Sequence, residues 1–211
     1  MPGTRPAIDA LLAFMKAEGV TVVFGIPGGL LYPFFDAVEH DEQLRLIVSR
    51  HEQGAAFMAD GFARTGHGIA ACAATSGPGA TNLLTGVACA FADGVPMLVL
   101  TGQAASHTLG RGAAQEAGRE DIDIVAMFRP VTKYSAMVTS AQSLSHHLRR
   151  AMRLARSGRP GRCTSTCRSR SGGSRPATTG SSPRPIAARR GAPITGRWRP
   201  RPRRCGPLTD R

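Results

Sequence analysis

Four loops in the first two thirds of the chain carry the residues that could do chemistry. They read "IPGG" (26–29), "SRHEQG" (49–54), "TSGPGATN" (75–82) and "TGQAASHTLGRGAAQEAG" (101–118). The second loop contains Glu52, and a carboxyl group shielded from water can hold or transfer a proton. Taken alone, Glu52 is more simply explained as an acid in the first turn of a helix, where the helix dipole favours negative charge.

Glycine and proline dominate the first and third loops. Pro27, Gly28 and Gly29 can form a simple turn between a strand and a helix. Alternatively, the two glycines let the backbone approach a bound group with no Cβ in the way. The third loop opens a helix, as phosphate-binding loops do. It lacks the Lys-Ser/Thr pair of a P-loop, however, so nucleotide binding is disfavoured.

Each loop is expected to follow a strand, since apolar runs alternate with segments of helical spacing. The predicted strands are 20–26, 44–49, 68–76, 95–103 and 129–138, and the predicted helices are 7–19, 30–38, 52–65, 77–94 and 140–158. This alternation indicates an α/β fold, a mainly parallel sheet with helices on both faces. Ligands bind at the carboxyl ends of such strands, where the four loops would lie together.

The composition of the chain changes after Gly161. Residues 162–211 hold 13 of the 27 basic residues, all of them arginine, but only one of the 14 acidic residues. Nearly all of the net charge of +13 therefore belongs to this segment. It contains few large apolar residues, so it cannot bury enough surface to offset chain entropy. We expect a globular domain over residues 1–161 and a disordered basic tail over residues 162–211.

In this order and spacing, the motifs resemble the pyrimidine-binding (Pyr) domain of thiamine-diphosphate enzymes, in its acetolactate-synthase-like branch. The segments that carry the resemblance are "VFGIPGG" (23–29), "RHEQGAAFMADGFARTGHG" (50–68), "ATSGPGATNLLTGVACAFADGVPMLVLTGQ" (74–103), "AAQEAG" (113–118) and "FRPVTKYSAMV" (128–138). The likeness extends over residues 5–161. Several ordered motifs are far more specific than any one of them alone.

The resemblance implies that Glu52 activates thiamine diphosphate. The cofactor's C2 carbon becomes a nucleophile when its own 4′-amino group, in the imino form, removes a proton. A water-shielded carboxyl group that shares a proton with ring nitrogen N1′ favours that form, and Glu52 matches this position. The resemblance further implies a set of cofactor-binding residues: Pro27, Gly28, Gly29, Glu52, Thr75, Pro78 and Asn82. Among them, Asn82 would cap or orient the third loop.

Two further positions bear on the substrate. Gln115 matches a family glutamine that faces the reacting centre, which implies a catalytic role in placing the substrate. Ala114 stands where acetolactate synthases usually carry phenylalanine, so the sequence leaves the substrate specificity open. Thr75 matches a position that some decarboxylase branches fill with histidine, which disfavours benzoylformate-type chemistry.

The resemblance also implies cofactors and partners. Thiamine diphosphate would act on a 2-oxo acid such as pyruvate, by carboligation or decarboxylation. Its diphosphate needs Mg²⁺, which the family binds through a second domain with a GDG…N motif that 211 residues do not include. The chain alone is therefore expected to be inactive and to need a partner subunit with that domain, within a homo-oligomer. The branch admits FAD as well, but the FAD-binding domain is absent here.

The basic tail has an explanation at the level of codons. Family members continue with a strand similar to "GPVHLDVPVD". With GC-rich codons for residues 161–169 (GGC CGG TGC ACC TCG ACG TGC CGG TCG), a shifted frame reads Pro-Val-His-Leu-Asp-Val-Pro. We therefore hypothesise a one-base deletion or sequencing error near Gly161, with residues 162–211 translated out of frame. The sheet is then expected to lack its last strand.

Two other functions are compatible with the sequence. The chain could be a stand-alone Pyr subunit that pairs with a separate diphosphate-domain chain. It could also bind nucleic acid through tail arginines such as Arg199 and Arg201, although an arginine run without a fold is weak support. The sequence contains no signal peptide and no apolar run of membrane-spanning length, so we expect a cytoplasmic protein without a membrane partner.

Overall fold

The structure is a computed structural model that describes residues 7–104, 111–112 and 122–157 and the backbone of residues 163–167. The strands are β1 (Val22–Gly25), β2 (Arg45–Val48), β3 (Ala70–Ala74), β4 (Met97–Thr101), β5 (Tyr134–Val138) and β6 (Cys163–Cys167). The helices are α1 (Ala7–Ala17), α2 (Tyr32–Glu39), α3 (Glu52–Arg64), α4 (Pro78–Ala92), α5 (Ile124–Phe128) and α6 (Ala141–Arg156). Two 3₁₀ turns, Gly29–Leu31 and Arg129–Val131, precede α2 and follow α5.

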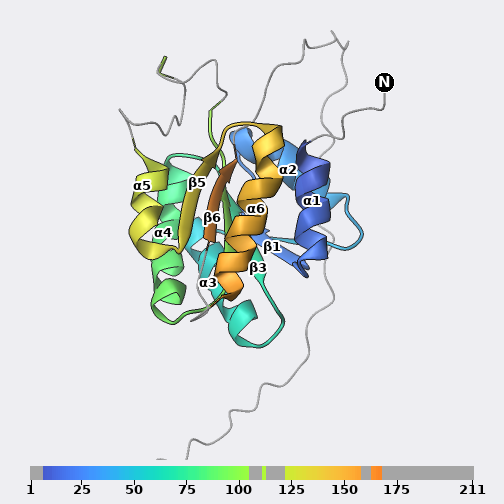
Figure 1. The fold of residues 1–211 in the computed structure, drawn as a ribbon, viewed down its shortest axis with the longest axis vertical. Coiled ribbons are helices and arrows are strands. Elements are labelled where there is room, and N and C mark those ends of the chain that lie inside the picture. The colour runs from blue at the N-terminus through green and yellow to red at the C-terminus, as the bar shows by residue number, and fades with distance from the viewer. Residues whose placement is uncertain (1–6, 105–110, 113–121, 158–162, 168–211) are drawn as a thin grey trace, which may run out of the picture. The chain divides into compact units, whose positions relative to one another are not determined.

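The strands form one parallel sheet in the order β2-β1-β3-β4-β6-β5. Successive residues of a strand point to opposite faces, and the core accordingly divides in two. On one face α1, α2 and α6 pack against β-strand residues such as Val23 and Leu98. On the other face α3, α4 and α5 pack against residues such as Phe24 and Val99. Figure 1 shows α1 and α6 in front of the strands, with α3 and α4 behind them.

The predicted fold class is confirmed, because the structure is an α/β domain with a parallel sheet between two helical layers. Each predicted strand and helix has a counterpart within a few residues. Helix α5 was not predicted, since the sequence reading treated residues 104–128 as a loop. Asp123 caps this helix through its side chain, which accepts a hydrogen bond from the backbone N–H of Ala126 at 2.9 Å.

The expectation that the sheet lacks its last strand is wrong. Residues 163–167 form β6, which pairs in parallel with β4 on one side and β5 on the other. Strand pairing uses main-chain N–H and C=O groups, so any extended segment can supply it. The threonines of "CTSTC" favour extended structure as well. Whether residues 168–211 form a disordered tail stays a prediction, because they lie outside the described residues.

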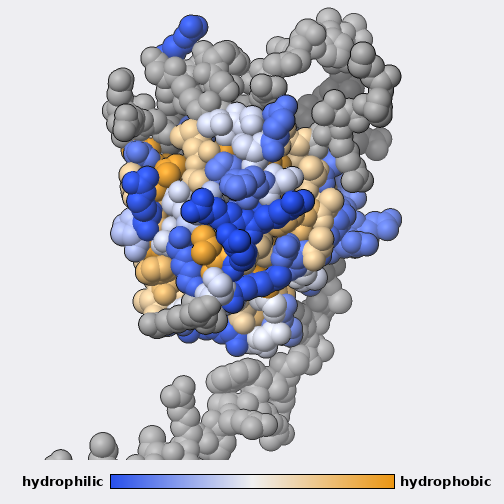
Figure 2. All heavy atoms as spheres, viewed as in Figure 1, coloured by the Kyte–Doolittle hydropathy of each residue, from blue (hydrophilic) through white to orange (hydrophobic). Residues whose placement is uncertain are grey.

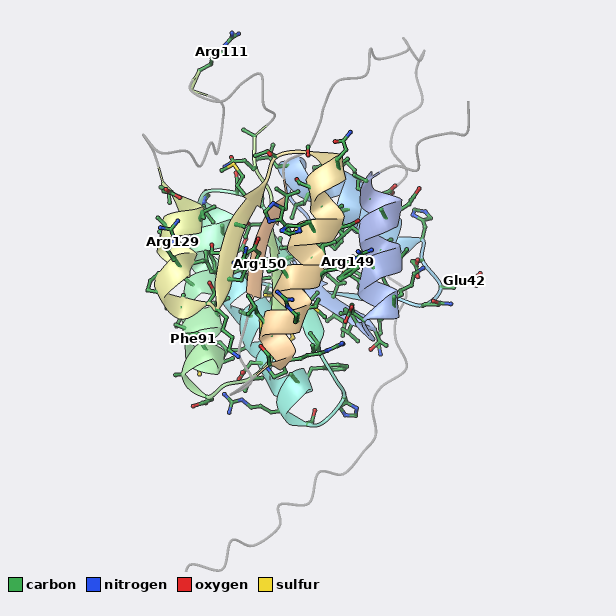
Figure 3. All side chains as sticks on the ribbon, viewed as in Figure 1. Glu42, Phe91, Arg111, Arg129, Arg149 and Arg150 are labelled. Atoms are coloured by element: carbon green, nitrogen blue, oxygen red, sulfur yellow. The ribbon has the colours of Figure 1, made fainter. Side chains whose placement is uncertain are left out.

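The exposed side of α6 is strongly basic. Figure 2 shows a hydrophilic band over this helix, and Figure 3 shows Arg149 and Arg150 projecting from it. The Arg150 guanidinium lies 5.1 Å from the centroid of the Tyr134 ring. The Tyr134 hydroxyl oxygen and His147 Nδ1 lie 2.5 Å apart. None of the helices in the described part of the chain is both long and apolar enough to cross a membrane.

This cluster predicts an acid-sensitive contribution to stability. The pKa of His147 lies below its ordinary value because burial disfavours the charged ring and because His146 and Arg150 add positive charge nearby. The unfolded chain therefore binds the proton more tightly, so the free energy of unfolding falls as pH decreases through about 6.5. Urea unfolding at about pH 7.5 and about pH 5 measures this effect. Between these two pH values, the free energy of unfolding should fall less in His147→Gln than in the natural chain. The exposed-site variant His40→Gln should match the natural chain; equal losses in both variants would contradict the prediction.

Candidate functional site

The four chemistry-bearing loops begin at one edge of the sheet. Strands β2, β1, β3 and β4 are neighbours and run parallel, so their carboxyl ends meet there. Main-chain hydrogen bonds continue past the strand ends and tie the loops together. Ser49 N donates to Gly25 O at 3.0 Å, and Gly102 N donates to Ala74 O at 3.0 Å. The prediction that these loops start from a common edge is confirmed.

The centre of this edge is a topological switch point. The chain leaves β1 toward α2, which packs on one face, and leaves β3 toward α4, which packs on the other. Because β1 and β3 are adjacent, their loops diverge to opposite sides of the sheet. Open α/β sheets bind ligands in the crevice that such diverging loops create. The loops 26–29 and 75–79 are therefore the place where a ligand would bind.

Gly28 and Thr75 make the contact between the two diverging loops. A Cβ atom built on Gly28 would lie 2.6 Å from the Thr75 Cβ and 3.2 Å from its Cγ2. Real Cβ atoms do not approach one another so closely, so this position needs a residue without a side chain. The contact fixes how far apart the first and third loops stand.

We expect Gly28→Ala to destabilise the protein by about 1–3 kcal/mol, because the new methyl group forces the two loops apart. Gly29→Ala is the matched control. A Cβ on Gly29 would have nothing within 4 Å, and the substitution should be close to neutral. The free energies of unfolding of both variants in urea measure the difference. Equal values for the two alanine variants would show that the loops do not meet at Gly28.

Glu52 is the first residue of α3 and lies half-buried at the same edge. The helix starts there because the His51 ring, at the N-cap, accepts a hydrogen bond at Nδ1 from Gln53 N at 3.2 Å. Asn82, in the second turn of α4, donates from Nδ2 to Glu52 Oε2 at 3.0 Å. This hydrogen bond joins α3 to α4 and fixes one carboxyl oxygen. Glu52 thus lies against the third loop.

The second carboxyl oxygen of Glu52 faces Gly79. A Cβ on Gly79 would lie 3.5 Å from Glu52 Oε1 and 2.8 Å from the Thr75 Cγ2. Glycine at this position thus lets the start of α4 pack closely against Thr75 and the Glu52 carboxyl group. A carboxyl group held beside the loops at the switch point suits a flat polar ring that exchanges a proton with it. The residues present fit the pyrimidine end of thiamine diphosphate.

The remaining predicted residues differ in their exposure to solvent. Pro27 is half-buried in the first loop, whereas Gly29 and Pro78 are exposed. Gln115 and its neighbour Ala114 lie outside the described residues, so the predicted role of Gln115 stays a prediction. The roles assigned to Glu52 and to the loop residues rest on their positions and are proposals.

The sequence reading missed two residues at this edge. Gly79 received no role, although glycine inside a predicted helix signals a close approach. Gln103 follows β4 and is wholly buried, and its Oε1 accepts a hydrogen bond from Ala104 N at 2.8 Å. A polar residue directly after a buried apolar strand was the available signal, because such side chains lie at the carboxyl edge.

The described residues contain no group of three or more His, Cys, Asp or Glu side chains that could hold a metal ion. Within those residues, the site offers one carboxyl group, one amide and two loops whose glycines allow close packing. This donor set can bind and orient a neutral heteroaromatic ring. It gives no set of oxygen ligands for the Mg²⁺ that a diphosphate group requires.

These features define a doubly wound α/β domain with a carboxyl group beside its switch point. The model of the family "Thiamine pyrophosphate enzyme, N-terminal TPP binding domain" matches residues 6–127, more than half of the chain. The chain belongs to this family, and the resemblance seen in the sequence is confirmed.

Individual relatives indicate which branch of the family the chain resembles. The chain is 44% identical over 153 residues to the probable acetolactate synthase large subunit of Methanocaldococcus jannaschii, covering 72% of this chain and 25% of that protein. It is 42% identical over 153 residues to the acetolactate synthase isozyme 1 large subunit of Escherichia coli, covering 72% of this chain and 26% of that protein. The acetolactate synthase large subunit of Lactococcus lactis is 41% identical over 151 residues, covering 72% of this chain and 25% of that protein. The chain therefore resembles acetolactate synthases but spans about a quarter of their length.

Proposed function

We propose that the chain supplies the pyrimidine-binding half of a thiamine-diphosphate site in an acetolactate-synthase-like enzyme that acts on a 2-oxo acid. The hydrogen bond from Asn82 to Glu52, which holds the carboxyl group against Gly79 and the third loop, is the observation that carries the proposal. When bound, thiamine diphosphate supplies a carbon nucleophile toward the carbonyl group of the substrate. We also propose that the protein is cytoplasmic, as expected from the sequence.

Each residue of the site has a distinct task in this proposal. Glu52 shares a proton with a ring nitrogen of the pyrimidine through one carboxyl oxygen, while Asn82 holds the other oxygen in place. Gly28 lets the first and third loops meet, and Gly79 lets the start of α4 pack closely against Thr75 and Glu52. Partial burial of the carboxyl group between α3 and α4 limits competition from water for the proton.

A partner domain must provide the diphosphate site and Mg²⁺. Large apolar side chains are exposed near the carboxyl edge, which supports a partner at this place. Phe57 and Met58 lie on α3 a turn and a half beyond Glu52, with 41% and 37% of their surfaces exposed, and Val48 ends β2. A domain that covers these side chains would also close the site. We propose that it belongs to a partner subunit of a homo-oligomer or to a separate chain.

A chimera tests the proposed function. Residues 7–157 of this chain would replace the matched segment in the Escherichia coli acetolactate synthase isozyme 1 large subunit. The expected result is thiamine-diphosphate-dependent consumption of a 2-oxo acid that needs Mg²⁺. A chimera that folds, judged by circular dichroism and a cooperative melt, but consumes no 2-oxo acid would contradict the proposal. For the unaltered chain, ligand-observed NMR should detect binding of the isolated aminopyrimidine.

A further inference from the structure

The gap between β4 and β5 has the properties of a binding site for an extended segment. In the sheet order, β6 separates β5 from β4, so β5 joins the sheet only through a strand in this gap. Both neighbours offer main-chain groups, because β6 pairs with β4 at positions 163–166 and with β5 at positions 163–167. An empty gap would leave these N–H and C=O groups without partners on two strands, which is costly where they are buried.

One side of the gap requires apolar residues. Positions 163 and 165 are in register with Leu98 and Leu100 of β4, and position 167 is in register with Val138 of β5. These three neighbours belong to one buried cluster with the α6 residues Leu144, Leu148 and Met152. Residues in register on parallel strands share a face. An occupant of the gap is therefore best matched when its first, third and fifth residues are apolar.

The other side of the gap has one polar and one apolar neighbour at each position. Position 164 is in register with Ser135, whose Oγ donates to Val125 O at 2.9 Å, and with the wholly buried Val99. Position 166 is in register with Thr101, which is wholly buried, and with Met137. The second and fourth positions of an occupant can therefore be polar or apolar. The preferred pattern alternates, apolar at odd positions and permissive at even ones.

The chain's own segment matches the backbone requirement but not this pattern. "CTSTC" places Ser165 in register between Leu100 and Ala136, with Cys163 and Cys167 at the other two odd positions. These residue types bury less apolar surface than valine or leucine would. The main-chain pairing of residues 163–167 with β4 and β5 is one that any extended segment can form.

We propose that the β4–β5 gap is a strand-acceptor site that binds an extended peptide with apolar first, third and fifth residues, parallel to both neighbours, in exchange for residues 163–167. Main-chain pairing supplies affinity and alternate side chains supply specificity in such strand additions. The occupant is defined by its pattern, and it acts at a place distinct from the proposed thiamine-diphosphate site.

The test uses the full chain and the peptide Arg-Val-Thr-Leu-Thr-Val-Arg, which keeps the residue types of positions 162, 164, 166 and 168. The control peptide carries aspartate in place of its central leucine. Fluorescence anisotropy of labelled peptides should show that the leucine peptide binds at least tenfold more tightly than the aspartate control. At saturation the leucine peptide should raise the thermal unfolding midpoint of the protein by about 4 °C or more. Equal binding of the two peptides, or no binding, would overturn the proposal.

A variant of the chain locates the bound peptide. Cys163→Val/Ser165→Leu/Cys167→Val fills the gap from within and should bind the leucine peptide at least tenfold more weakly than the natural chain. Thr164→Val/Thr166→Val, which changes the other side of the same strand, should weaken binding far less. Unchanged affinity in the triple variant would show that the peptide binds elsewhere and would overturn the proposal.

Discussion

Glu52→Gln is expected to lower the turnover of the chimeric acetolactate synthase by about 10²–10⁴-fold, the usual contribution of a positioned acid–base group. Glutamine has nearly the shape of glutamate and can still interact with Asn82, so the helix contact should survive. It cannot share a proton with a ring nitrogen. The loss should therefore appear in kcat, with cofactor binding changed only a few-fold.

The control for this experiment is Glu42→Gln. Glu42 is an exposed glutamate in the loop after α2, and Figure 3 shows it on the outside of the domain. The substitution removes the same charge but leaves the carboxyl edge unchanged, so kcat should match that of the parent chimera. If both glutamine variants lost activity equally, a general effect of charge would explain the result. If Glu52→Gln retained full turnover, its proposed role would be wrong.

Ligand-observed NMR on the unaltered chain provides a readout that does not depend on activity. The aminopyrimidine should bind to the natural protein and to Glu42→Gln with similar affinity. Gly79→Val should abolish binding, because its side chain would collide with Thr75 Cγ2 and displace the Glu52 carboxyl group. Binding that survives in Gly79→Val would place the pyrimidine away from Glu52.

Much of the site could be predicted because its residues lie next to strand ends. Glu52 and Asn82 are 30 residues apart, yet each follows a strand of the same parallel sheet, and parallel strands end at one edge. The apolar runs located those strands, so the sequence predicted the meeting of the loops. It could not predict that Gly79 rather than Gly29 would border the Glu52 carboxyl group. That depends on how α3 and α4 pack.

The last strand could not be predicted from residue types. "CTSTC" lacks the apolar alternation that identifies a strand, and only the gap between β4 and β5 makes it one. The register adds support to the hypothesis of a shifted reading frame. With the GC-rich codons assumed above, that frame would encode valine, leucine and valine at positions 163, 165 and 167, the three positions that share a face with Leu98, Leu100 and Val138. Sequencing the gene through this region tests the hypothesis directly.

Helix α5 escaped prediction because five residues are too few for a periodic pattern. Tertiary contacts hold it in place instead. Phe128 is 0% exposed and lies with Ile124 in the cluster between the sheet and the helices of that face. Its neighbour in the chain, Arg129, begins a 3₁₀ turn that leads to β5. The position of β5, and with it one side of the strand-acceptor site, therefore depends on how Phe128 packs.

Phe128→Ala should lower the free energy of unfolding by about 3–5 kcal/mol, because it removes a fully buried ring and leaves a cavity. Ile122→Ala is the matched control, since Ile122 precedes the same helix but has 42% of its surface exposed. That variant should lose less than about 1 kcal/mol. Urea unfolding monitored by circular dichroism measures both values. A loss in Phe128→Ala as small as that in Ile122→Ala would mean that α5 does not anchor the segment that connects β4 to β5. The strand-acceptor site would then be held by main-chain pairing alone.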